Sequence, residues 1–197
     1  MNLQITAVAG LVLVLAACGG GGDGGTTPDG VPVAKAECPN QFANSGSRVS
    51  AGGIMQGGSD PQKAVDGNFG SSALLYGAAA DTGTDAAEIY SAPASVLDLV
   101  VTAASGLSFP AGNRAGAVAQ LASGPAVQQQ VTVITYLGGV VQEAFDGGLY
   151  NSITAPTSSQ VFSYLTTKAY DSVRFSILLS SPASTERPQV KVYEFCG

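Results

Sequence analysis

The 197-residue sequence contains no histidine and no tryptophan, and only 11% of its residues are charged. Without histidine the chain cannot build a Ser-His-Asp or Cys-His nucleophile system, and it lacks the side chain that most often transfers protons near neutral pH. The eight Lys and Arg residues form no cluster, and the net charge is −6. Because phosphate binding needs concentrated basic residues, we expect no nucleic-acid partner. We also expect that the protein is not an enzyme.

The chain opens with an apolar run from Leu3 to Ala17, which ends in small residues before a cysteine. The run is too short to span a membrane comfortably and is typical of a secretory signal. The segment Leu15-Ala16-Ala17-Cys18 resembles the lipobox of bacterial lipoproteins. That resemblance implies removal of residues 1–17, acylation of Cys18 with chains such as palmitate, and, because Gly19 follows, sorting to the outer membrane. The alternative is an ordinary signal peptide, with Cys18 as a spare thiol.

A linker is expected between the lipidated cysteine and the folded domain. Residues 19–25 contain six glycines, and residues 26–33 add two prolines without any apolar periodicity. Such a composition favours a flexible tether. We therefore divide the chain into a signal peptide at 1–17, a lipidated cysteine with its linker at 18–36, and one domain at 37–197.

Two cysteines remain once Cys18 is acylated, and they lie near the two ends of the domain. Secretion places Cys38 and Cys196 in an oxidising compartment, where only one pairing is available to them. We expect a disulfide. In the chain-entropy model, closing a loop of about 158 residues stabilises the fold by at most about 4–5 kcal/mol.

The domain is expected to consist of short strands joined by turns. Gly138-Gly139 separates two β-rich runs and predicts a hairpin. A short helical or turn segment is expected at 61–65, and the stretch before it shows no strand pattern. Together with weaker candidates, about eight strands predict an all-β protein, a β-sandwich or jelly roll. The expected strands are 87–90, 95–102, 116–121, 131–137, 140–145, 161–166, 172–179 and 189–195.

Glu194 stands out in the last strand. Strict alternation places Val190, Val192 and Glu194 on one face of the strand, toward the core, and Lys191, Tyr193 and Phe195 on the other. A buried carboxylate needs a cation, because leaving it unpaired costs several kcal/mol. The candidates are a metal ion or an arginine such as Arg174 or Arg48.

An oxygen-rich turn lies near the start of the domain, at Asp66-Gly67-Asn68. Such a turn, with Ser71 nearby, can present carboxylate, amide, hydroxyl and carbonyl oxygens, which are the ligands that calcium prefers. A plain Asx turn without any metal is the alternative.

The turn and the closing strand together resemble discoidin, or F5/8 type C, domains and related carbohydrate-binding modules of the galactose-binding-like fold. Residues 64–68 match the Ala-x-Asp-Gly-Asn segment of that family, and residues 170–177 are similar to its penultimate strand. Residues 190–196 are similar to its closing strand, in which a Glu precedes the final cysteine. Ala73 stands where the family has Trp. The resemblance implies a jelly-roll β-sandwich.

The resemblance also implies a structural calcium ion between the turn and the closing strand. Carried over by position, the ligands would be the carboxylates of Asp66 and Glu194, the backbone carbonyls of Lys63, Asn68 and Tyr193, and Ser71. These six oxygens would suffice for calcium.

Ligands of such folds usually bind at loops at one end of the sandwich. Tyr76, Asn113 and Arg114 lie in expected loops or strand ends and are the candidate ligand-binding residues. We therefore expect a membrane-anchored, non-catalytic binding or adhesion lipoprotein of the cell envelope, with a glycan as one candidate ligand. The alternative is a structural or assembly lipoprotein whose partner is another envelope protein.

Overall fold

The computed structural model describes Cys38, Phe42 and residues 46–54, 57–77, 95–121, 128–151, 158–180 and 188–197. The expected signal peptide, the lipidated Cys18, the linker and the expected strand at 87–90 lie outside these residues. Within the described part of the chain, no helix is long and apolar enough to cross a membrane.

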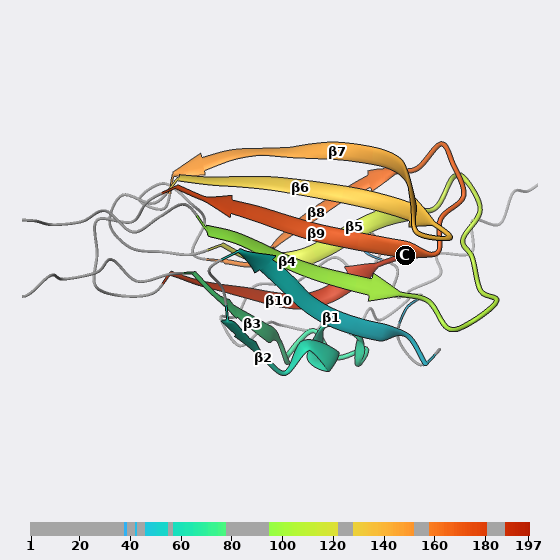
Figure 1. The fold of residues 1–197 in the computed structure, drawn as a ribbon. Helices are drawn as coiled ribbons and strands as arrows, with labels where there is room; N and C mark the ends of the chain where they lie inside the picture. The colour runs from blue at the N-terminus through green and yellow to red at the C-terminus, as the bar shows by residue number, and fades with distance from the viewer. Residues whose placement is uncertain are drawn as a thin grey trace, which may run out of the picture.

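The described residues form two five-stranded antiparallel sheets that pack face to face (Figure 1). The first sheet has the order β1 (Arg48–Ile54), β4 (Ser95–Thr102), β9 (Ser172–Leu179), β6 (Gln128–Leu137) and β7 (Val140–Asn151). The second has the order β2 (Gly57–Ser59), β3 (Ala73–Tyr76), β10 (Gln189–Cys196), β5 (Arg114–Gln120) and β8 (Gln160–Leu165). A short 3-10 helix, η1 (Pro61–Val65), connects β2 to β3. The expected all-β sandwich is confirmed.

The core lies between the sheets and follows the period-two pattern of the central strands. Its main cluster includes, all fully buried, Leu97, Leu99 and Val101 of β4, Val173, Phe175 and Ile177 of β9, Ala117 and Ala119 of β5, and Val190 and Val192 of β10. Alternate residues of the first sheet point away from this core.

Most expected strands are confirmed, and β9 has the expected bounds. The hairpin at Gly138-Gly139 is confirmed as well, although β6 begins earlier and β7 ends later than expected. Three strands, β1, β2 and β3, were not expected. β1 and β2 are rich in glycine, which packs no side chain and weakens the strand pattern, and β3 has only four residues.

The alternation expected for the last strand is wrong beyond Val192. The pairing of β10 with β5 shifts between Val192 and Glu194, as at a β-bulge. Phe195, expected on the opposite face, therefore joins the main core, whereas Glu194 lies opposite Val118, which belongs to a second cluster with Cys38, Phe69, Tyr193 and Cys196. Since directly paired residues share a face, the bulge turns Glu194 toward the outer side of the second sheet.

The two ends of the domain are joined as expected. Cys38 and Cys196 form a disulfide with a Cα–Cα separation of 4.6 Å. Nearby, Phe42 packs its ring 4.8 Å from that of Phe109 and 6.4 Å from that of Phe195. Cys38 is therefore attached covalently, and Phe42 by aromatic packing, to the end of β10.

The first prediction concerns Gly116, which pairs with Cys196 of β10 and with Ser163 of β8. A Cβ at this position would collide with the backbone carbonyl of Phe162. We expect Gly116→Ala to lower the free energy of unfolding by about 2–3 kcal/mol in denaturant titrations, because β8 must move away. Gly52→Ala is the control, since its Cβ would lie 3.9 Å from the nearest atom. Equal midpoints for the two variants would contradict this packing.

Candidate functional site

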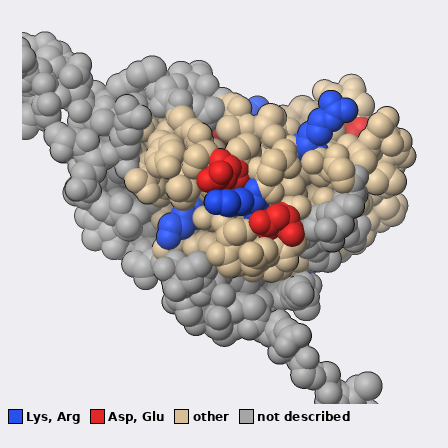
Figure 2. Space-filling model, turned by 90° about the horizontal axis from the view of Figure 1, so that it is seen from below, with Lys and Arg blue, Asp and Glu red and all other residues tan. Residues whose placement is uncertain are grey.

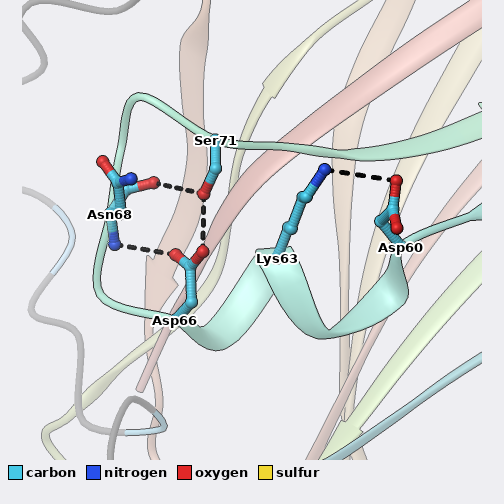
Figure 3. Close-up of polar contacts among 5 residues, drawn as sticks. All are labelled: Asp60, Lys63, Asp66, Asn68 and Ser71. Atoms are coloured by element: carbon cyan, nitrogen blue, oxygen red, sulfur yellow. Dashed lines mark hydrogen bonds and ion pairs between the residues drawn. The ribbon is translucent and has the colours of Figure 1, made fainter.

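The oxygen-rich turn follows η1 directly and is closed by its own side chains (Figure 3). Asp66 Oδ1 accepts the Asn68 N–H at 2.8 Å, and its Oδ2 accepts the Ser71 hydroxyl at 2.6 Å. The same hydroxyl lies 3.1 Å from the Asn68 carbonyl oxygen. The Lys63 ammonium points away from this group and pairs with Asp60 at 3.2 Å. The turn thus gathers a carboxylate, a hydroxyl and a carbonyl within hydrogen-bonding distance.

Glu194 reaches this turn from the other end of the chain. Its carboxylate is fully buried, and its Oε1 accepts the backbone N–H of Gly67. Of the two arginines considered as its partner, Arg174 pairs with Asp98 on β4, and Arg48 begins β1 of the opposite sheet. The Asp-Gly-Asn turn and the glutamate of the closing strand are therefore in contact. This contact is a hydrogen bond from the Gly67 backbone amide to the Glu194 carboxylate.

The residues around the turn fit a calcium ion in their chemistry. Asp66 offers a carboxylate, Ser71 a hydroxyl and Asn68 a carbonyl oxygen, and such oxygens are the ligands that calcium prefers. The hydrogen bond from the Asn68 N–H to Asp66 Oδ1 is that of an Asx turn. Glu194 supplies a second carboxylate at the same turn. The described residues contain no group of three acidic, histidine or cysteine side chains for a metal, so an ion here would depend on backbone and hydroxyl oxygens.

The three candidate ligand residues do not form one surface. Tyr76 pairs with Gln189 at the start of β10, whereas Arg114 lies two residues beyond Gly116, the partner of Cys196 at the end of β10. The eight residues of β10 span about 24 Å. Arg114 donates a hydrogen bond to Ser163 at 3.1 Å, and the Asn113 carbonyl accepts one from Thr166 at 2.9 Å. Tyr76 thus lies at one end of the second sheet, and Asn113 and Arg114 lie at the other.

A groove of about 390 Å³ lies elsewhere, on the outer face of the first sheet. Four adjacent strands and the turn of the β6–β7 hairpin contribute to it. Its lining consists of Ser50 and Gly52 of β1, Asp98, Val100 and Thr102 of β4, Ser172 and Arg174 of β9, Tyr136 of β6, and Gly139. The volume lies at the lower end of the range for small-molecule sites. We call this feature the outer-face groove.

Arg174 lies at the centre of the outer-face groove and is held from two sides. Its Nη2 donates to Asp98 Oδ2 at 2.6 Å, and its side chain also hydrogen-bonds Tyr136. Burial alone would lower the pKa of Arg174, but the hydrogen bonds to Asp98 and Tyr136 and the charge of Asp98 outweigh it and raise that pKa. The Asp98 side chain is 9% exposed and that of Arg174 is 33% exposed. The guanidinium is thus fixed, charged and partly open to the groove.

Figure 2 views the molecule from the side of η1 and shows a few acidic and basic side chains next to one another on an otherwise uncharged surface.

The sequence analysis missed the outer-face groove. Period-two alternation puts Asp98 on the face of its strand opposite Leu97 and Leu99, but Arg174 lies 76 residues away in sequence. The contact exists because β4 and β9 are neighbours with Val100 opposite Arg174. In the sequence, the only signal for the Asp98–Arg174 contact is that two half-buried strands carry opposite charges. This signal does not specify which strands are neighbours.

The second prediction compares Glu194 with Ser71. We expect Glu194→Ala to lower the free energy of unfolding by about 2–3 kcal/mol, because it removes a charged acceptor and leaves the Gly67 N–H without it. Ser71→Ala removes a surface hydrogen bond and should cost about 1 kcal/mol or less. Denaturant titrations at neutral pH in the presence of a chelator measure both. If the two variants unfold at the same midpoint, Glu194 does not hold the turn.

Comparison with known proteins finds similarity only among solved structures, since neither the family models nor the curated proteins match this sequence. Chitosan-binding module 1 of a chitosanase/glucanase from Paenibacillus sp. IK-5 is 18% identical, with a TM-score of 0.40, covering 80% of this chain and 96% of that module. The family 32 module of NanJ from C. perfringens, solved with galactose, is 12% identical, with a TM-score of 0.37 and coverages of 74% and 93%. The family 29 module CBM29_1 from Piromyces equi is 12% identical, with a TM-score of 0.40 and coverages of 78% and 85%. At these TM-scores, the fold assignment rests on the strand order of the chain itself.

Proposed function

We propose that this protein is a lipid-anchored, non-catalytic carbohydrate-binding protein of the outer membrane. The observation that carries the proposal is the outer-face groove with its fixed Asp98–Arg174 pair. A concave site that presents a few convergent polar groups on a rigid sheet is the common form of a small-molecule site. The three candidate ligand residues expected from the sequence, Tyr76, Asn113 and Arg114, are not part of this site, because they lie at opposite ends of the second sheet.

The lining of the groove suits a ligand rich in hydroxyl groups. A sugar hydroxyl donates and accepts hydrogen bonds at once, and here a carboxylate acceptor stands beside a guanidinium donor. Hydrogen bonds to ionised groups are about twice as strong as neutral ones. Ser172 and Thr102 add hydroxyl groups that already contact each other at 3.0 Å.

A second candidate function is docking to another envelope protein. Edge strand β7 exposes Val140, Val141 and Leu149, and edge strand β8 exposes Leu165. Long edge strands with exposed apolar side chains can pair with another chain. This is the observation that favours a structural or assembly role. A protein that co-purifies with the full chain and is released by Val141→Lys would support it.

The third prediction tests sugar binding with a matched pair of conservative variants. We expect the full chain, purified in a detergent without a sugar head group, to bind oligosaccharides on a glycan array. Arg174→Lys should weaken that binding at least tenfold in calorimetry, because lysine keeps the charge but loses the planar donor geometry. Arg114→Lys, on the second sheet, is the control and should bind as the wild type does. A loss confined to Arg114→Lys would place the ligand at the loops instead.

The fourth prediction concerns the anchor. Cells fed labelled palmitate should incorporate it into the wild-type chain, because the lipobox resemblance implies a triacylated Cys18. More than one acyl chain is what stable membrane anchoring requires. Cys18→Ser should abolish the label and leave a heavier, unprocessed precursor. The double variant Cys38→Ser/Cys196→Ser controls for the loss of cysteine as such and should remain labelled. Label on the Cys18→Ser chain would exclude this anchor.

We further propose that the Asp66 turn holds a structural calcium ion, with Glu194, Ser71 and the carbonyls of Lys63, Asn68 and Tyr193 as the other ligands. The fifth prediction is that calcium raises the melting temperature of chelator-treated protein by about 5 °C or more, because an ion bound only by the folded state stabilises it. Asp66→Ala should remove this increase, whereas Asp60→Ala, whose carboxylate pairs with Lys63, should retain it. An unchanged melting temperature in the wild type would exclude the site.

A further inference from the structure

We infer that the outer-face groove takes an uncharged sugar, and that Gly52 is the residue that leaves the Asp98–Arg174 pair open to it. The inference rests on the proposed function, since it specifies the class of sugar and the determinant of access at the same site.

The charges of the groove cancel. Asp98 and Arg174 are the only charged residues in its lining, and they form an ion pair at 2.6 Å. The remaining lining residues are serine, threonine, tyrosine, valine and glycine. Two charged residues lie next to lining residues. Arg48 lies opposite Thr102, and Asp171 directly precedes Ser172. These two neighbours carry opposite charges as well.

An acidic sugar would gain little from this arrangement. Its carboxylate would have to compete with Asp98 for the guanidinium, and separating a partly buried ion pair leaves the other charge poorly solvated. The chain as a whole carries a net charge of −6, which does not attract an anion. An uncharged sugar can instead accept a hydrogen bond from the partly exposed Arg174 guanidinium and donate one to Asp98 Oδ2, the oxygen that Arg174 also contacts, which leaves the pair intact. Asp98 Oδ1 is buried and does not take part.

Strand register determines which residue stands over the carboxylate. Gly52 of β1 lies directly opposite Asp98, and Ser50 lies opposite Val100. On the other side of β4, Val100 lies opposite Arg174. β1 is the edge strand of the first sheet. On the side of Asp98 that faces away from β9, its directly paired residue is therefore Gly52.

The lack of a side chain at Gly52 therefore has a direct effect on access. A Cβ at this position would lie 3.9 Å from the Cβ of Asp98, which is an ordinary contact, and no left-handed backbone conformation requires glycine there. The backbone at this position thus accepts a Cβ, and a larger side chain would start directly beside Asp98 and narrow the approach to the pair. Any β-branched residue would also suit a strand better than glycine does.

The test measures sugar binding to the full chain by calorimetry in a detergent without a sugar head group. One panel contains neutral oligosaccharides of glucose, galactose, mannose and N-acetylglucosamine, and a second contains oligosaccharides with glucuronic, galacturonic or sialic acid. We expect binding from the neutral panel, with an affinity that changes less than twofold between 50 and 500 mM salt, because no net charge is neutralised.

Two glycine variants then locate the sugar. Gly52→Val should weaken binding at least tenfold without lowering the melting temperature. Gly57→Val is the matched control, because it makes the same change on edge strand β2 of the other sheet, where a Cβ would lie 3.8 Å from the Tyr76 ring. It should bind as the wild type does.

The outcomes separate the inference from the function on which it rests. Tighter, salt-sensitive binding of the acidic panel would overturn the inference but leave sugar binding in place. The same holds if neutral sugars bind and Gly52→Val binds them equally well, since the site would then lie elsewhere. If neither panel binds, the proposed function fails together with the inference.

Discussion

The position of β10 in the middle of the second sheet is the constraint on which the rest of the domain depends. β10 pairs with β3 on one side and β5 on the other, and six of its eight residues are buried. The bulge of β10 lets Glu194 and Phe195 point to the faces that their contacts require. Phe195 packs into the main core, whereas Glu194 turns outward to hold the Gly67 amide. The next residue after Phe195, Cys196, forms the disulfide with Cys38.

The fold depends less on the Asp98–Arg174 ion pair than on the contacts of β10. Partly exposed ion pairs contribute little net stability, and well-packed apolar residues often replace buried pairs at no cost. The neighbouring outward position on β4 is occupied by Val100, so an apolar residue is tolerated on this face. The proposed function therefore assigns this pair of lining residues to ligand recognition rather than to stability.

Sequence reasoning succeeded where a single strand or a covalent pairing carried the information. The alternation of Leu97, Leu99 and Val101 specified a half-buried strand, and the hairpin followed from Gly138-Gly139. It failed where the outcome depends on which strands become neighbours. A bulge cannot be recognised in Val192-Tyr193-Glu194 without its partner strand, and Asp98 meets Arg174 only through the pairing of β4 with β9. Likewise, nothing local to Tyr76 or Arg114 indicates that β10 separates them.

The central claim is that a sugar binds on the outer face of the first sheet. The most direct measurement is amide chemical-shift mapping by NMR while the protein is titrated with the oligosaccharide that binds it best. The account predicts shift changes concentrated on β1, β4, β9 and β6, around Gly52, Asp98 and Ser172. Shift changes confined to the ends of the second sheet, around Tyr76 or Asn113 and Arg114, with the outer face of the first sheet unchanged, would contradict it.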